Sequence, residues 1–111
     1  MRILIGGIAV AVLVGCTTTA LQERPPALAE HSSKTPQQFA RCLAPKWQAI
    51  NSSTSSYETE QGYGITATAT FTGVVALAVI KTQPDGSSVE IFLPSDWAGT
   101  RGWKRSAQSC L

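Results

Sequence analysis

Histidine is almost absent from this chain, because His31, in a polar segment between Glu30 and Ser32, is the single histidine among its 111 residues. Histidine is the side chain that general acid–base catalysis uses most often. The chain also lacks a glycine-rich phosphate-binding loop, a CxxC motif and a motif of paired carboxylates. These absences argue against an enzyme, so we expect no catalytic residue, no cofactor and no bound metal.

An excess of charge of one sign is missing as well. Nine Lys and Arg stand against seven Asp and Glu, which gives a formal net charge of +2. Neither a dense run of Lys and Arg nor an aromatic RNA-binding signature accompanies this small excess. We therefore expect no nucleic-acid partner.

The chain has no apolar run long enough to cross a membrane as a permanent helix. Its apolar N-terminal stretch, residues 3–14, follows Arg2 and falls well short of the roughly 20 residues that a transmembrane helix needs. A short apolar stretch behind one cation is typical of an export signal. The stretch ends in Leu13-Val14-Gly15-Cys16, with a small residue directly before the cysteine.

Leu13-Val14-Gly15-Cys16 resembles the lipobox of bacterial lipoproteins. The resemblance implies cleavage between Gly15 and Cys16, transfer of diacylglycerol to the sulfur of Cys16, and acylation of the new amino terminus, commonly with palmitate. More than one acyl chain makes such attachment to membrane lipid effectively permanent. Because Thr17 rather than aspartate follows the cysteine, the resemblance also implies the outer membrane, with the domain facing the periplasm and the inner membrane as the alternative location. A non-lipidated signal, or a short membrane helix with an incidental cysteine, is the alternative.

The chain then divides into a linker and a domain. We expect a lipoprotein signal peptide at 1–15, a lipidated flexible tether at 16–34 and a small α+β domain at 35–111. The tether is polar, contains Pro25-Pro26 and has no sustained periodicity, so as a flexible chain it would span on the order of 25 Å. His31 within the tether is expected to be solvated rather than a metal ligand or a pH switch.

The cysteine count predicts a disulfide. With Cys16 used by lipid, Cys42 and Cys110 remain as an even pair in an exported, oxidising compartment. Closing so long a loop would stabilise the domain by roughly 4 kcal/mol. Two buried free thiols or a metal pair are the alternatives.

The ordered part begins with a helix-start signature, in which Thr35 is the N-cap, Pro36 follows it, and Gln38 can close a capping box. Pro45 conflicts with one straight helix, because proline lacks an amide proton and crowds the carbonyl of Arg41. We expect a helix over roughly 36–49 that is bent near Arg41 to Pro45, or two short helices. Its apolar stripe, which we expect in the core, contains Phe39, Cys42, Leu43, Trp47 and Ile50. Alternatively, Phe39 and Trp47 form a ligand platform.

Strand signals fill the middle of the chain. Residues 57–60 can form a polar edge strand, and residues 65–72 alternate apolar residues with threonine, as a half-buried strand does. The apolar run 74–80 predicts a central strand, and the following Pro-Asp-Gly-Ser supplies turn chemistry for a hairpin of 75–82 with 87–94. Together these segments predict an antiparallel meander of three to four strands.

A last helix carries Trp103, Ala107 and Cys110 on one face. A bridge from Cys42 to Cys110 would tie the N-terminal and C-terminal helices to one face of the sheet, which gives an α+β fold stapled by a disulfide. A small β-barrel or sandwich with both ends wrapped around it is the alternative. Residues 39–43 with Trp47, and the closing Cys110-Leu111, are also similar to uncharacterised small lipoproteins of proteobacteria.

Binding functions remain once catalysis is set aside. In the first, the lipid-anchored domain is an interaction or structural module that docks an envelope protein. In the second, it binds an anionic envelope polymer or lipid headgroup, such as lipopolysaccharide or peptidoglycan, with buried Trp103 and solvated cations as the plainer alternative. The candidate ligand surface consists of Trp97, Arg101, Trp103, Lys104 and Arg105. A small periplasmic enzyme inhibitor is a third function, which no motif specifically supports.

Overall fold

The computed structural model describes residues 21–69, 73–94 and 101–111. It confirms the α+β fold, with one antiparallel sheet, two helices and a disulfide, but the sheet has five strands rather than three or four. In chain order the elements are β1 (Leu28–Ser32), α2 (Pro36–Ile50), β2 (Thr54–Thr59), β3 (Gly62–Ala69), β4 (Gly73–Gln83), β5 (Gly86–Phe92) and α3 (Arg101–Cys110).

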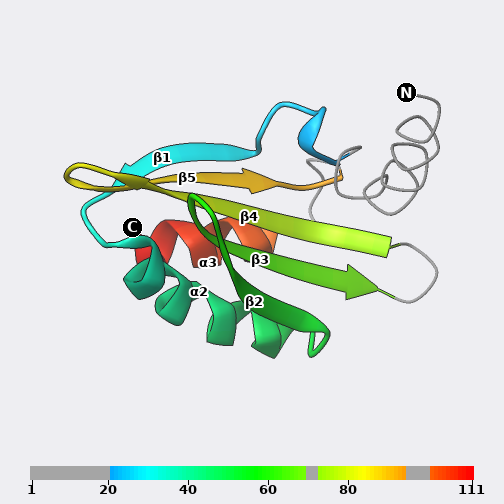
Figure 1. Cartoon of the computed structure of the whole chain (residues 1–111). Helices are drawn as coiled ribbons and strands as arrows, with labels where there is room; N and C mark the ends of the chain where they lie inside the picture. The colour runs from blue at the N-terminus through cyan, green and yellow to red at the C-terminus, as the bar shows by residue number, and fades with distance from the viewer. Residues whose placement is uncertain (1–20, 70–72, 95–100) are drawn as a thin grey trace, which may run out of the picture.

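The strands lie in the order β1-β5-β4-β3-β2, and every neighbouring pair is antiparallel. The meander predicted from the sequence is β2 to β5. Strand β1 is added beside β5, so α2 crosses from one edge of the sheet to the other before the meander begins. Figure 1 shows the sheet as one layer and α2 and α3 together as a second layer.

Strand β1 lies inside the segment predicted to be a flexible tether, so that prediction is wrong for this part of the chain. Leu28 pairs with Ile91 and Ser32 pairs with Ser87. Between these two buried residues the side chains are exposed, because β1 is an edge strand, and this hides the alternation that marks a strand. Gly86, the first residue of β5, permits the close approach of β1, because a Cβ at this position would overlap the carbonyl oxygen of Ser32.

Helix α2 begins as predicted but does not break. The Thr35 hydroxyl accepts a hydrogen bond from the amide of Gln38 at 3.2 Å, and the Gln38 side chain accepts one from the amide of Thr35 at 3.0 Å. The helix then continues through Pro45 to Ile50, so the alternative of two short helices is wrong. Both Pro45 and Arg41 are exposed, and solvent can therefore reach the Arg41 carbonyl that loses its helical donor.

The Thr35→Ala variant is expected to lower the free energy of unfolding by about 1 kcal/mol, because it removes the side-chain acceptor of the capping box. The measurement is urea unfolding followed by circular dichroism. Ser33→Ala, at a neighbouring exposed position, is the matched control and should change stability by less than about 0.5 kcal/mol. Equal effects of the two substitutions would contradict the capping role.

The main core lies between the sheet and the helices. Alanines on β3 and β4 leave room for the large aromatic side chains of α2, as close packing requires. Ile50, predicted to belong to the buried stripe, is instead 45% exposed at the end of the helix. The fully buried residues of this core include Phe39, Leu43, Trp47, Ile65, Ala67, Ala76, Ala78, Ile80, Val89, Ile91, Ala107 and Cys110.

A second, smaller apolar cluster lies on the sheet face that the helices leave uncovered. Leu21 packs there against Leu77 of β4 and Phe92 of β5, with Val74 and Val79 beside them. Strand β4 therefore contributes to both faces, which agrees with the prediction of a central strand from its unbroken apolar run. The cluster also fixes the start of the described chain, residue 21, to the sheet.

Candidate functional site

The predicted lipidation and cleavage residues, Gly15 and Cys16, lie outside the described residues, and so does Trp97 of the predicted ligand surface. The other members of that surface lie on α3. Arg101 and Arg105 are exposed, and Lys104 is half-buried.

Trp103 does not belong to a ligand surface, because its side chain is buried. Its ring meets that of Trp47 edge to face, with the centroids 5.2 Å apart and the planes at 87°. The indole nitrogen of Trp47 also donates a hydrogen bond to the carbonyl oxygen of Trp103 at 3.1 Å. The structure thus agrees with the plainer alternative for Trp103, which is buried, and leaves Arg101 and Arg105 exposed beside it.

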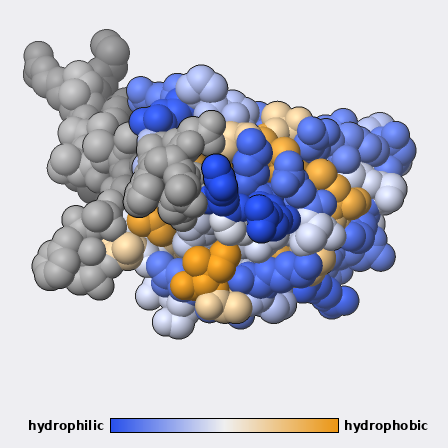
Figure 2. Space-filling view, turned by 180° about the vertical axis from the view of Figure 1, so that it is seen from behind, coloured by the Kyte–Doolittle hydropathy of each residue, from blue (hydrophilic) through white to orange (hydrophobic). Residues whose placement is uncertain are grey.

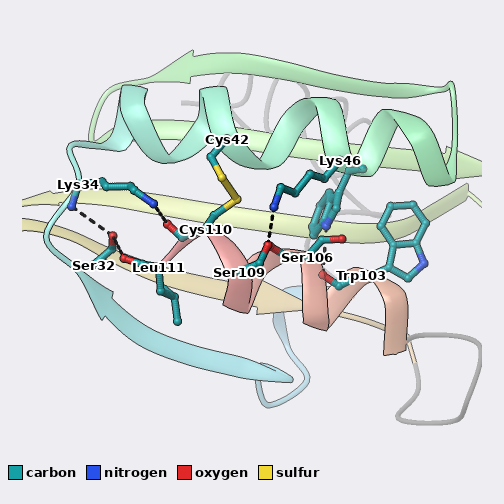
Figure 3. The surroundings of a disulfide bond; sticks show 10 residues. Ser32, Lys34, Cys42, Lys46, Trp103, Ser106, Ser109, Cys110 and Leu111 are labelled. Carbon is teal, nitrogen blue, oxygen red and sulfur yellow. Dashed lines mark hydrogen bonds between the residues drawn. A yellow bond between two sulfur atoms is a disulfide. The ribbon is translucent and has the colours of Figure 1, made fainter.

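The predicted disulfide joins α2 to α3. Cys42 and Cys110 form an S–S bond of 2.08 Å with a Cα–Cα distance of 5.8 Å. The neighbouring seam between the helices is polar, because the ammonium group of Lys46 donates to the hydroxyl of Ser109 at 2.7 Å (Figure 3). At the same end of α3, Lys34 bonds to the carbonyl of Cys110, and the hydroxyl of Ser32 donates to the carbonyl of Leu111 at 3.1 Å.

The two described helices carry basic residues and no acidic ones. Within residues 21–69, 73–94 and 101–111 the structure forms one ion pair, between His31 Nε2 and Asp85 Oδ1 at 3.0 Å, and both side chains are well exposed. The helix cations thus have no acidic partner in the described chain. They are Arg41, Lys46, Arg101, Lys104 and Arg105.

Three of these cations form what we call the basic row: Arg101, Arg105 and Lys46. Arg101, Arg105 and Ser109 follow one another at intervals of four residues, so they share one face of α3 at a spacing of about 6 Å. Lys46 reaches the end of this line from α2 through its bond to Ser109. Figure 2 shows the molecule from behind relative to Figure 1. On the face visible there, hydrophilic residues cover most of the described surface, and apolar residues form small separate groups.

The helix dipoles do not account for these cations. A basic residue stabilises a helix when it lies in the last turn, near the negative end of the dipole. Neither α2 nor α3, as the structure describes them, has a basic residue in its last turn. The cations therefore leave a positive surface that neither ion pairing nor helix stabilisation explains.

Two open hollows lie elsewhere on the described surface. One, of about 330 Å³, runs between α2 and strands β2 and β3, where Tyr63 and Arg41 line it. The other, of about 550 Å³, lies over β1, β4 and β5 and is lined by His31, Lys81 and Glu90 among others. No group of three or more His, Cys, Asp or Glu in the described residues could hold a metal ion.

His31 is thus exposed, as predicted, but it lies on a strand rather than in a tether and pairs with Asp85. Sequence reasoning missed Lys46 as a member of the positive surface, because it is 55 positions from Arg101 along the chain. Neither of the two helices that the structure describes has the length and apolar composition needed to cross a membrane. Comparison with protein-family models, curated proteins and solved structures finds no match for the chain.

Proposed function

We propose that the protein is a lipid-anchored lipoprotein of the cell envelope, attached through Cys16 and facing the periplasm from the outer membrane. Its domain is a non-catalytic interaction module. The anchor follows from the apolar stretch that ends in the lipobox-like residues 13–16. The location follows from Thr17 by the same resemblance.

The observation that best supports an interaction module is the positive helix surface. Five cations without acidic partners in the described chain lie on two helices that a disulfide and a tryptophan pair hold together. Because the helices are held rigidly, the domain loses little conformational entropy when a partner binds. This surface favours an anionic partner, whether a lipid headgroup, an acidic envelope protein or a charged polymer.

The Cys16→Ala variant tests the anchor. The parent protein, expressed in a Gram-negative bacterium, is expected in the membrane fraction with the intact mass of residues 16–111 plus diacylglycerol and an acyl chain. The variant should retain residues 1–15 and carry no lipid, because it lacks the nucleophilic sulfur. Thr17→Ala is the matched control and should be processed and acylated like the parent. A bare thiol at Cys16 in the parent, or an uncleaved leader, contradicts the proposed anchor.

A further inference from the structure

We infer that one end of the domain binds an anionic lipid surface, so that this end of the anchored domain lies against the membrane that holds Cys16. We call it the Leu21 end: there β3 ends at Ala69, β4 begins at Gly73 and β5 ends at Phe92. The opposite end, which carries the β4–β5 turn, is the Asp85 end. The inference rests on the proposed anchor at Cys16 and adds the orientation and the lipid contact.

The length of chain before Leu21 limits how far the domain can stand from the membrane. Leu21 is buried against Leu77 and Phe92, so the sheet fixes its position. Only residues 17–20 separate it from Cys16, and five extended residue steps reach about 18 Å at most. An acylated Cys16 therefore keeps the Leu21 end close to the headgroups, unlike the long tether that the sequence predicted.

The basic row begins at this same end. The C-cap residue of α2, Asn51, donates from its side chain to the carbonyl of Thr68 at 2.9 Å, and Thr68 pairs with Val74, which packs against the cluster that contains Leu21. Gly102 lies against Ile50, because a Cβ built on Gly102 would be 3.6 Å from the Ile50 side chain. The N-terminal part of α3, with Arg101, is thereby placed at the Leu21 end.

Charge is distributed unequally along the direction of the strands. Among the described residues, four basic ones and one acidic one lie at the Leu21 end: Arg24, Arg101, Lys104 and Arg105, with Glu23. In the half of the molecule toward the Asp85 end, five acidic residues outnumber three basic ones. Of the described residues they are Glu30, Glu58, Glu60, Asp85 and Glu90, with Lys34, Arg41 and Lys81. Glu90, two positions from Phe92, and Lys46, bonded to Ser109, both lie near the middle of the molecule, and Lys46 is counted at neither end.

This distribution matches an anionic bilayer on one side of the molecule. Cations are attracted to a negative membrane surface only within about one Debye length, roughly 8–10 Å at moderate salt. The short connector keeps the Leu21 end near the anchor, so that Arg24 and the start of α3 can come within that range, whereas Asp85 and Glu60 lie at the opposite end of the strands. The exposed Ile50 beside Gly102 adds an apolar group at the basic end, which a headgroup region accepts more readily than a soluble polyanion does.

Lysine labelling can measure this orientation on the lipidated protein itself. The acylated protein is reconstituted into phosphatidylcholine vesicles with or without phosphatidylglycerol and labelled by a water-soluble lysine-reactive ester, and each site is quantified by mass spectrometry. Phosphatidylglycerol should slow the labelling of Lys104 about fivefold. Lys34 and Lys81, in the other half of the molecule, should label equally on both vesicles, and high salt should abolish the difference at Lys104.

Matched variants separate lipid binding by the Leu21 end from the effect of total charge. Arg101→Gln with Arg105→Gln removes two exposed cations at the Leu21 end and should abolish the protection of Lys104. Arg41→Gln with Lys81→Gln removes the same charge elsewhere and should leave that protection intact, with Lys34 as the remaining reference site.

Several results would contradict lipid binding by the Leu21 end. They are equal labelling of Lys104 on both vesicles, equal protection of all sites, or protection in detergent micelles by a soluble polyanion such as heparin. The intact mass is read first and reports the anchor independently. If it shows a bare thiol, acylation of Cys16 is contradicted. Lipid binding by the Leu21 end is then tested on the same protein coupled through Cys16 to a maleimide lipid.

Discussion

Removing the disulfide by Cys42→Ser with Cys110→Ser is expected to lower the free energy of unfolding by about 4 kcal/mol. The two cysteines are separated by 68 positions, and opening a loop of this size restores to the unfolded chain the entropy that the bridge removed. In so small a domain the loss corresponds to a fall in Tm of about 20 °C. The measurement is thermal unfolding followed by circular dichroism.

The structure also indicates which part of the fold depends most on the bridge. Helix α3 has ten residues, of which Trp103, Ala107 and Cys110 are buried. A helix of that length is marginal in water by itself, because nucleation is costly. In the variant we therefore expect amide hydrogen exchange to rise first in α3 and last in β3 and β4.

A reductant supplies the control for this experiment. It should lower the Tm of the parent protein by the same amount as the double substitution and leave the Tm of the variant unchanged. A shift of only a few degrees in the variant would show that packing around Trp47 holds α3 without the bridge.

Local signals in the sequence predicted much of the fold. The capping box needs only Thr35 and Gln38, and the alternation within 65–69 needs only neighbours along one strand. The cysteine pair follows from counting once one cysteine is assigned elsewhere. Each of these signals is contained in a few residues or in the composition, so no knowledge of distant contacts is required.

Features that depend on distant contacts were not predicted. Strand β1 has the exposed residues Ala29, Glu30 and His31 between Leu28 and Ser32, and it is a strand because β5, about sixty positions later, offers a free edge. The basic row has the same origin, since Lys46 joins Arg101 and Arg105 only after the two helices pack. Continuation of α2 through Pro45 depends on the exposure of that turn, which the linear sequence does not state.

The buried position of Leu21 limits how freely the domain can move relative to Cys16. A flexible tether of residues 17–34 would have let the domain sample many orientations, whereas the four residues 17–20 before a buried leucine allow few. In the proposed lipid-anchored arrangement, the short connector therefore limits the orientations of the domain on the membrane. It also directs the Asp85 end, with its acidic residues and hairpin turn, toward the periplasm in the proposed arrangement.

Trp47→Ala is expected to lower the free energy of unfolding by about 3–5 kcal/mol. The Trp47 side chain is fully buried at the centre of the contact between α2, α3 and the sheet. Truncation leaves a cavity, removes the edge-to-face contact with Trp103, and leaves the Trp103 carbonyl without its indole donor. Urea unfolding measures the loss.

The Trp47→Phe variant separates the contributions of packing and of the hydrogen bond to this loss of stability. Phenylalanine keeps most of the aromatic packing and removes the indole N–H, so the cost should be about 1–2 kcal/mol, the value of one buried hydrogen bond with a small void. If alanine and phenylalanine cost the same, the hydrogen bond to Trp103 dominates and the packing term is wrong. If the alanine variant alone is strongly destabilised, the ring itself joins the helices, and the surface that carries Arg101 and Arg105 owes its rigidity to Trp47 as well as to the disulfide.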